Sequence, residues 1–252
     1  MSDDTETKLS AARTRLILDK PFLGALVLRM PMKAAVPKWC KTIGTDARSF
    51  YYNPEYIDSL SVDQAQFALA HEALHCALSH FSRREHRDRH RWDIACDLAI
   101  NPLLIKEGMT APPGALYDVG FEGMMAEEIY PYIKDDTEQE THDDHLYGKD
   151  SDSRDDSSQQ TETDAGDSRE GEEQGGGGGS GGEAEHAMAP PDALSETEKE
   201  QLSVQWRQRL AGAAQQAMQA GKLGGNLKRL VDHLLQPQLP WRCLLYTSDA
   251  AD

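Results

Sequence analysis

Residues 61–81 read SVDQAQFALAHEALHCALSHF, and this stretch decides the fold. Ser61 followed three residues later by Gln64 fits a capping box, in which each side chain bonds the other residue's backbone N–H. Apolar side chains then recur at spacings of three and four residues, the period of an α-helix: Phe67, Ala70, Leu74, Ala77, Leu78 and Phe81. The pattern predicts a capped amphipathic helix from about residue 62 to residue 81.

Within this helix the run His-Glu-Ala-Leu-His has the spacing of a metal site. His71 and His75 are four residues apart, so their rings project from one face and can share one ion. Glu72 is adjacent to the first ring and faces the position that two histidines leave open for water. We therefore expect a zinc site with His71 and His75 as ligands and Glu72 as the catalytic general base. The alternative is that both histidines are ordinary polar residues beside the core face.

A third ligand is expected from a second apolar helix, predicted over residues 92–105 and bent or restarted at Pro102. Asp97 lies among apolar residues there, where burying an unpaired carboxylate would be costly and a metal ion would satisfy it. Asp93 and Asn101 complete a polar stripe at four-residue spacing and could orient the ligands. The alternative is that this stripe is a solvated face of the helix.

His80 is the rival third ligand. It follows His75 by five residues, and an uninterrupted helix would turn it away from the site, so we rank it below Asp97. No role is assigned to the remaining histidines, which lie in an arginine-rich turn, in an acidic segment or near the C-terminus: His86, His90, His142, His145, His186 and His233.

The flanking residues predict an α+β domain over residues 1–134. Residues 4–18 have helical spacing, and residues 22–36 and 43–52 carry the apolar, β-branched and aromatic residues of a small sheet. A short helix is expected at residues 125–133. In this interpretation the sheet packs on the active-site helix and on the second ligand helix.

The net charge of −17 is concentrated in one segment. Residues 135–186 hold 18 acidic and 3 basic residues, so the rest of the chain is close to neutral. Residues 135–191 are almost free of apolar side chains and are predicted to be a disordered acidic Gly/Ser-rich linker. Residues 83–91 are the only dense basic stretch and are interrupted by acids, which argues against a nucleic-acid-binding protein.

Residues 192–242 return to helical composition and are expected to lead into a further domain. Residues 243–252, CLLYTSDAAD, are what one reading frame of a common transposase sequencing adapter would encode, so we interpret them as foreign to the natural protein. The chain has no Cys-x-x-Cys pair, no secretory signal and no apolar stretch of membrane-spanning length. We therefore expect a cytoplasmic protein with reduced thiols and no membrane span.

Five stretches between Thr45 and Tyr130 resemble the N-terminal domain of a bacterial metallopeptidase family that carries a C-terminal von Willebrand factor A-like domain. They are TDARSFYYNPEYI, AHEALHCALSHF, RWDIACDLAINPLL, PPGALYD and GMMAEEIY, and they cover about a third of the chain. The acidic segment, the helix around Trp206 and the string QPQLPWR resemble the middle section of the family. Met125 departs from the pattern, because a Ser or Thr is expected to cap the short helix there.

The resemblance implies a zincin-like core with His71 and His75 as ligands and Glu72 as general base. It also implies that the domain missing from this chain is the von Willebrand factor A-like one, whose relatives often work beside MoxR-type AAA ATPases.

Two functions follow from the sequence. The first is a zinc metallopeptidase that hydrolyses peptide or protein substrates through a metal-activated water, with Glu72 as the base. The second is a metal-stabilised chaperone-like or scaffold protein acting with the von Willebrand factor A-like domain and a MoxR-type ATPase. The two hypotheses predict different results for Glu72→Gln. In the first, the substitution abolishes cleavage but keeps zinc, and in the second it leaves the function of the protein unchanged.

Overall fold

The computed structural model describes residues 2–135, 137, 139, 141, 143–146 and 189–235. The chain forms helices α1 (Ser2–Asp19), α2 (Pro21–Val27), α3 (Pro54–Ser59), α4 (Val62–Ala77), α5 (His80–Arg83), α6 (Arg89–Lys106), α7 (Ala126–Ile129), α9 (Glu196–Gln219) and α10 (Gly225–Leu235). Short 3-10 turns occupy Val119–Phe121 and Tyr130–Tyr132. The strands are β1 (Met32–Ala34), β2 (Ile43–Thr45), β3 (Phe50–Tyr52) and β4 (Asp144–His145).

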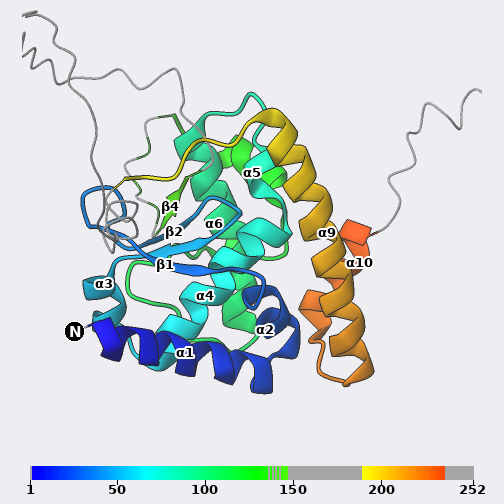
Figure 1. The fold of residues 1–252 in the computed structure, drawn as a ribbon. Coiled ribbons are helices and arrows are strands. Elements are labelled where there is room, and N and C mark those ends of the chain that lie inside the picture. Colours follow the sequence, from blue (N-terminus) through cyan, green and yellow to red (C-terminus); the bar gives the residue numbers. More distant parts are fainter. Residues whose placement is uncertain are drawn as a thin grey trace, which may run out of the picture.

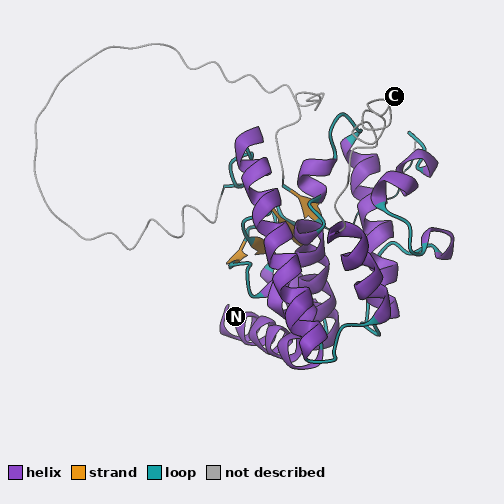
Figure 2. Cartoon of the chain, turned by 90° about the vertical axis from the view of Figure 1, so that its right-hand side faces the viewer, coloured by secondary structure: helices purple, strands orange, loops and turns teal. Residues whose placement is uncertain are grey.

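The four strands form one small sheet in the order β1-β3-β2-β4. β2 and β3 pair antiparallel, whereas β1 lies parallel to β3 and β4 lies parallel to β2. Figure 2 shows this sheet as a small patch beside a mostly helical body. The predicted α+β class is therefore confirmed, with helices as the larger part.

The helix α4 lies at the centre of the fold (Figure 1), between the sheet, α1 along the base and α9 at the side. Ser61 caps it as predicted: the Ser61 side chain accepts from the Gln64 N–H, and the Gln64 side chain accepts from the Ser61 N–H. The helix ends earlier than predicted, because Ser79 adopts a left-handed backbone with φ of 56°. His80 begins the separate short helix α5, so its direction is independent of the turn of α4.

The prediction of strand structure across residues 22–36 is wrong for its first part, which forms α2. Pro21 stands at the start of this helix, where its fixed φ suits the first turn and its missing N–H costs nothing. Gly24 lies against the backbone of α1: a Cβ at this position would come within 2.6 Å of the Cα of Ile17. This close contact between two consecutive helices is a tertiary contact that the apolar pattern of residues 22–36 alone does not show.

The C-terminal helices pack on the same core as the N-terminal ones. Trp206 of α9 is completely buried, and its indole N–H donates to the carbonyl of Ala47 at 2.9 Å. Leu227 and Val231 of α10 belong to the same apolar cluster. Residues 194–235 are thus an integral part of the domain that begins with α1.

Four residues of the segment that was predicted to be a linker are built into the fold. Residues 143–146 run along β2, and the Leu146 N–H donates to the carbonyl of Thr45 at 2.9 Å. Of the rest of that predicted linker, residues 147–188 lie outside the described residues, as does the predicted adapter sequence at 243–252.

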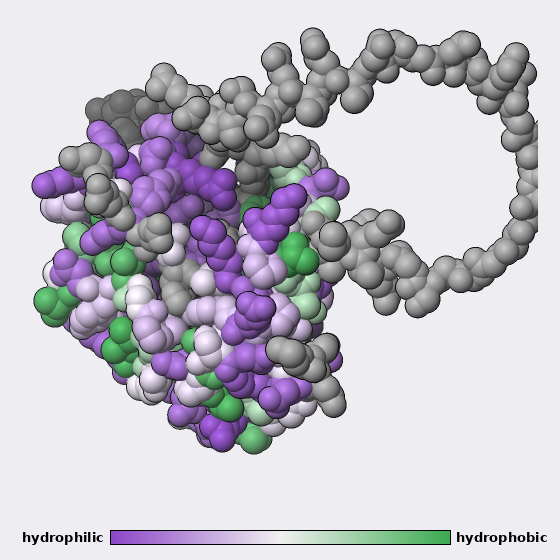
Figure 3. Space-filling view, turned by 90° about the vertical axis from the view of Figure 1, so that its left-hand side faces the viewer, coloured by the Kyte–Doolittle hydropathy of each residue, from purple (hydrophilic) through white to green (hydrophobic). Residues whose placement is uncertain are grey.

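The described surface is mixed in character. On the face shown in Figure 3, apolar residues are scattered in small groups among polar ones. Among the helices that the structure describes, none is both long and apolar enough to cross a membrane.

Candidate metal centre

Four buried side chains converge beneath the sheet. His71 and His75 project from α4, Asp97 projects from α6, and Asp143 immediately precedes β4. One ligand atom from each lies within 4.8 Å of the others. All four residues are buried, with at most 4% of any of them exposed. The structure thus brings together the three ligands proposed from the sequence and adds a fourth candidate, Asp143.

The spacing of these atoms suits one small ion. The Nε2 atoms of His71 and His75 are 2.9 Å apart, and Oδ1 of Asp97 lies 3.5 and 3.4 Å from them respectively. Oδ2 of Asp143 lies 3.5 Å from the Nε2 of His71. A tetrahedral zinc ion with ligands at about 2.0–2.1 Å would separate its donor atoms by about 3.3 Å. The donor set and its spacing therefore fit a metal ion of this size.

The ring of His71 is held in the orientation that a metal ligand needs. The Asn101 side chain donates from Nδ2 to the carbonyl of Leu116 at 2.9 Å, so its Oδ1 is the atom directed at Nδ1 of His71, also at 2.9 Å. Because that oxygen can only accept, Nδ1 of His71 carries a proton, and Nε2 is the ring nitrogen left to bind a metal ion. Asp93, Asp97 and Asn101 are all buried, so the alternative of a solvated stripe is wrong.

His80 contacts the other side of His75. The two Nδ1 atoms are 3.2 Å apart, which leaves Nε2 of His75 directed at His71 and Asp97. A His75 Nδ1–H donating to His80 would orient the ring much as Asn101 orients His71. His80 also lies near the buried thiol of Cys96, and His75, His80 and Cys96 form a second group with metal-ligand spacing.

Glu72 is fully buried beside the cluster, and neither of its carboxylate oxygens accepts a hydrogen bond from the described residues. Its pKa is raised well above the usual value, first by burial and then by the neighbouring charge of Asp143. A buried acid without donors destabilises the fold. Such an acid is most readily explained by a chemical task.

Asp143 and His145 are the residues that sequence reasoning missed. His145 contacts Oδ2 of Asp143 through Nε2 at 2.8 Å and Oδ1 of Asp93 through Nδ1 at 2.9 Å. Both residues lie in a segment whose acidic composition predicted a linker, so neither was considered as a ligand. Their separation by two positions could have indicated a site, because it puts two side chains of an extended strand on the same face.

The buried carboxylates of the cluster carry more negative charge than the neighbouring positive charges offset. The pKa of Asp97 is raised by burial and then by the charge of Asp143. Burial also opposes ionisation of Asp143, but His145 and His71 outweigh it and lower the pKa of this carboxyl. In the absence of an ion, the Asp143 carboxylate in turn raises the pKa of His71 against the effect of burial. A divalent cation would offset the excess negative charge directly.

Comparison with protein families assigns the chain to a family. A family model described as "Putative metallopeptidase domain" matches residues 4–248. The chain belongs to this family. The family description and the convergent ligand atoms together indicate a metal-dependent hydrolase.

Relatives add little beyond the family. A Thermotoga maritima protein described as "Uncharacterized protein" is 38% identical over 98 residues, which is 33% of this chain and 25% of the relative. The chain thus matches only a quarter of that relative's length. No solved structure matches the chain.

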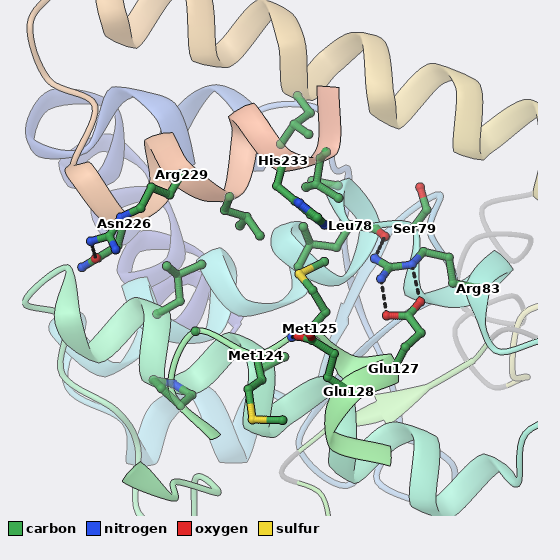
Figure 4. Close-up of a pocket in the computed structure, with 18 of the residues that line it drawn as sticks. Leu78, Ser79, Arg83, Met124, Met125, Glu127, Glu128, Asn226, Arg229 and His233 are labelled. Atoms are coloured by element: carbon green, nitrogen blue, oxygen red, sulfur yellow. Dashed lines mark hydrogen bonds and ion pairs between the residues drawn. The ribbon is translucent and has the colours of Figure 1, made fainter. Parts of the chain in front are cut away.

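The domain also contains a separate cavity of about 970 Å³ between α4, α6, α9 and α10 (Figure 4). Arg83 and Glu127 form an ion pair in its wall, and Met124, Met125 and His233 also line it. No member of the metal cluster is among its lining residues. The cavity therefore does not give access to the candidate metal centre.

Proposed function

We propose that this chain is a zinc-dependent peptidase in which His71, His75 and Asp97 hold the ion and Glu72 is the general base. The observation that supports this proposal most strongly is the position of Glu72. It is a buried carboxylate without hydrogen-bond donors among the described residues, and it lies beside the converging Nε2 atoms of His71 and His75. The contact of β2 with the ligand helix α4 accords with a zincin-like core, which we include in the proposal.

The donor set favours zinc. Two imidazole nitrogens and one carboxylate oxygen are a common catalytic zinc set, whereas magnesium and calcium take oxygen ligands. A zinc ion bound there would polarise a substrate carbonyl and acidify a water molecule. Glu72 would take the proton from the attacking water and deliver it to the nitrogen of the leaving amine, so that the C–N bond breaks.

The second candidate is a metal-stabilised scaffold. It is favoured by the presence of a fourth protein ligand candidate, since structural zinc sites are closed by four ligands and catalytic sites keep a position open. It gives no task to Glu72, which a purely structural site would leave as an uncompensated burial cost. Action beside a von Willebrand factor A-like domain and a MoxR-type ATPase belongs to this candidate and stays a proposal.

The test compares the zinc-loaded full chain with Glu72→Gln, which keeps the shape of the side chain and removes the base. Zinc is counted per chain, and cleavage of denatured casein is followed by release of new amino groups. We expect one zinc in both proteins and a fall in the rate of about 10²–10⁴-fold in the variant, the usual contribution of a general base. Glu200→Gln, an exposed change on α9, is the matched control and should cleave as wild type does.

Equal cleavage by wild type and Glu72→Gln would overturn the assignment of the base. Zinc bound without any cleavage, both in the wild type and in Asp143→Ala, which lacks the fourth ligand candidate, would favour the scaffold. Absence of bound zinc would remove the basis of both candidates.

A further inference from the structure

We infer that residues 143–146 are a built-in inhibitory segment, which lies in the peptide-binding position of the proposed peptidase and closes its metal centre with Asp143. This inference rests on the proposed function and names a regulation of the same site. Three observations carry it: the burial of the centre, the strand-like seating of the segment, and the position of the Asp143 carboxylate.

The centre is closed in this conformation. Glu72, His75 and Asp97 are each 0% exposed and His71 is 2% exposed, and the large cavity of the domain lies elsewhere. A peptide bond cannot reach these groups unless something moves. The ligand helices α4 and α6 form the packed interior of the fold, so they are poor candidates for movement.

The segment is seated as a bound peptide would be. β4 adds to the edge of β2, with Asp144 opposite Gly44 and His145 opposite Thr45. Adding an extended strand to a sheet edge is a recurrent way in which proteins bind peptides, because backbone groups supply the affinity. While β4 occupies this edge of β2, a substrate strand cannot pair there.

Asp143 stands where substrate and water would have to enter. Its Oδ2 is 3.5 Å from the Nε2 of His71, and its carboxylate lies close to that of Glu72. With His71, His75 and Asp97 it makes a four-donor set, and a catalytic zinc site requires one of those positions to be open. Asp143 is the removable donor, because the other three are fixed on long helices.

Among the described residues, the contacts that hold the segment are mostly polar. His145 bridges Asp143 to Asp93, and the Arg89 guanidinium donates to the carbonyl of His145. Leu146 is only partly buried and packs on the small apolar group around Tyr51. A two-residue strand at a sheet edge has fewer interactions to lose than the long helices that carry the other ligands, so it is the element of the centre that detaches most readily.

The experiment uses the full chain loaded with Co²⁺ in place of zinc, because the visible absorption of Co²⁺ reports its coordination. Acetohydroxamate, a small metal-chelating ligand, is titrated into wild type, Asp143→Ala and Leu146→Ala. Leu146→Ala loosens the segment without touching the cluster, so it serves even where Asp143→Ala folds poorly. Leu18→Ala, an exposed change on α1, is the matched control.

We expect one Co²⁺ per chain in every protein and tighter hydroxamate binding in both segment variants. Hydroxamate can bind only to molecules in which Asp143 has left the metal, so its apparent affinity is the intrinsic affinity multiplied by the fraction of such open molecules. If the segment is seated in most wild-type molecules, Asp143→Ala should bind hydroxamate roughly tenfold more tightly or better. Leu146→Ala should gain less, and Leu18→Ala should match wild type.

Unchanged hydroxamate affinity in either segment variant, with Co²⁺ bound, would overturn the inference and leave the proposed peptidase standing. Loss of Co²⁺ from Asp143→Ala alone, in protein whose circular dichroism matches that of wild type, would also overturn it, because Asp143 would then be an obligatory ligand. Failure of the wild type to bind Co²⁺ would overturn the inference together with the proposed function.

Discussion

At the scale of single residues, Asn101 determines how His71 presents its ring. Its amide is fixed by the carbonyl of Leu116, and its oxygen in turn fixes the proton on Nδ1 of His71. Supporting partners of this kind hold a ligand in its productive tautomer, and their loss commonly weakens metal binding by about 10–100-fold.

We therefore expect Asn101→Ala to raise the zinc dissociation constant by about 10–100-fold, as measured by competition with a chromophoric chelator. Asn226→Ala on α10, at the separate cavity, should leave the constant unchanged. A wild-type constant in Asn101→Ala would show that the orientation of His71 does not depend on this relay.

The residue scale is also where the sequence was most informative. The spacing of His71 and His75 on a capped helix predicted their convergence, and the cost of burying Asp97 among apolar neighbours predicted its direction. Asp143 could not be found in this way, because its place depends on the pairing of β4 with β2, a contact between residues about a hundred positions apart.

At the scale of elements, the contact between α1 and α2 rests on one glycine. A Cβ at Gly24 would lie 2.6 and 2.7 Å from the Cα and N of Ile17, which are backbone atoms that cannot rotate away. The apolar residues 22–27 were also compatible with a strand, whereas Pro21 in the first turn and the close approach of Gly24 to α1 accompany the helix that forms.

Gly24→Ala should therefore lower the free energy of unfolding, by about 1–3 kcal/mol as is typical of overpacking. Gly212→Ala on α9 is the matched control, because a Cβ there would meet nothing within 4 Å. In an exposed helix interior it should raise the free energy of unfolding by about 0.5–1 kcal/mol. Urea denaturation measures both, and a Gly24→Ala protein as stable as wild type would contradict the packing described.

Other element boundaries show the same division between local and long-range causes. Ser61 and Gln64 begin α4 as predicted because a capping box is a local device. The end of α4 was predicted too late, because the apolar period continues through Phe81 while the backbone breaks at Ser79. That break is what lets His80 contact Nδ1 of His75.

At the scale of the whole molecule, the candidate centre is assembled from parts that are distant in sequence. α4 supplies two donors, α6 a third and the edge strand of the sheet a fourth, and α9 closes the core through Trp206. The acidic stretch that was predicted from its composition to be a linker supplies Asp143 to this centre. That contribution depends on the pairing of β4 with β2, so it could be recognised only from the fold.

The most direct test of the central claim is zinc K-edge X-ray absorption of the zinc-loaded full chain. The account predicts one zinc bound by nitrogen and oxygen at about 2.0–2.2 Å, with the outer-shell scattering of two imidazoles and no sulfur. A sulfur ligand at about 2.3 Å would place the ion instead on Cys96 with His75 and His80. That result, or the absence of imidazole scattering, would contradict the site formed by His71, His75 and Asp97.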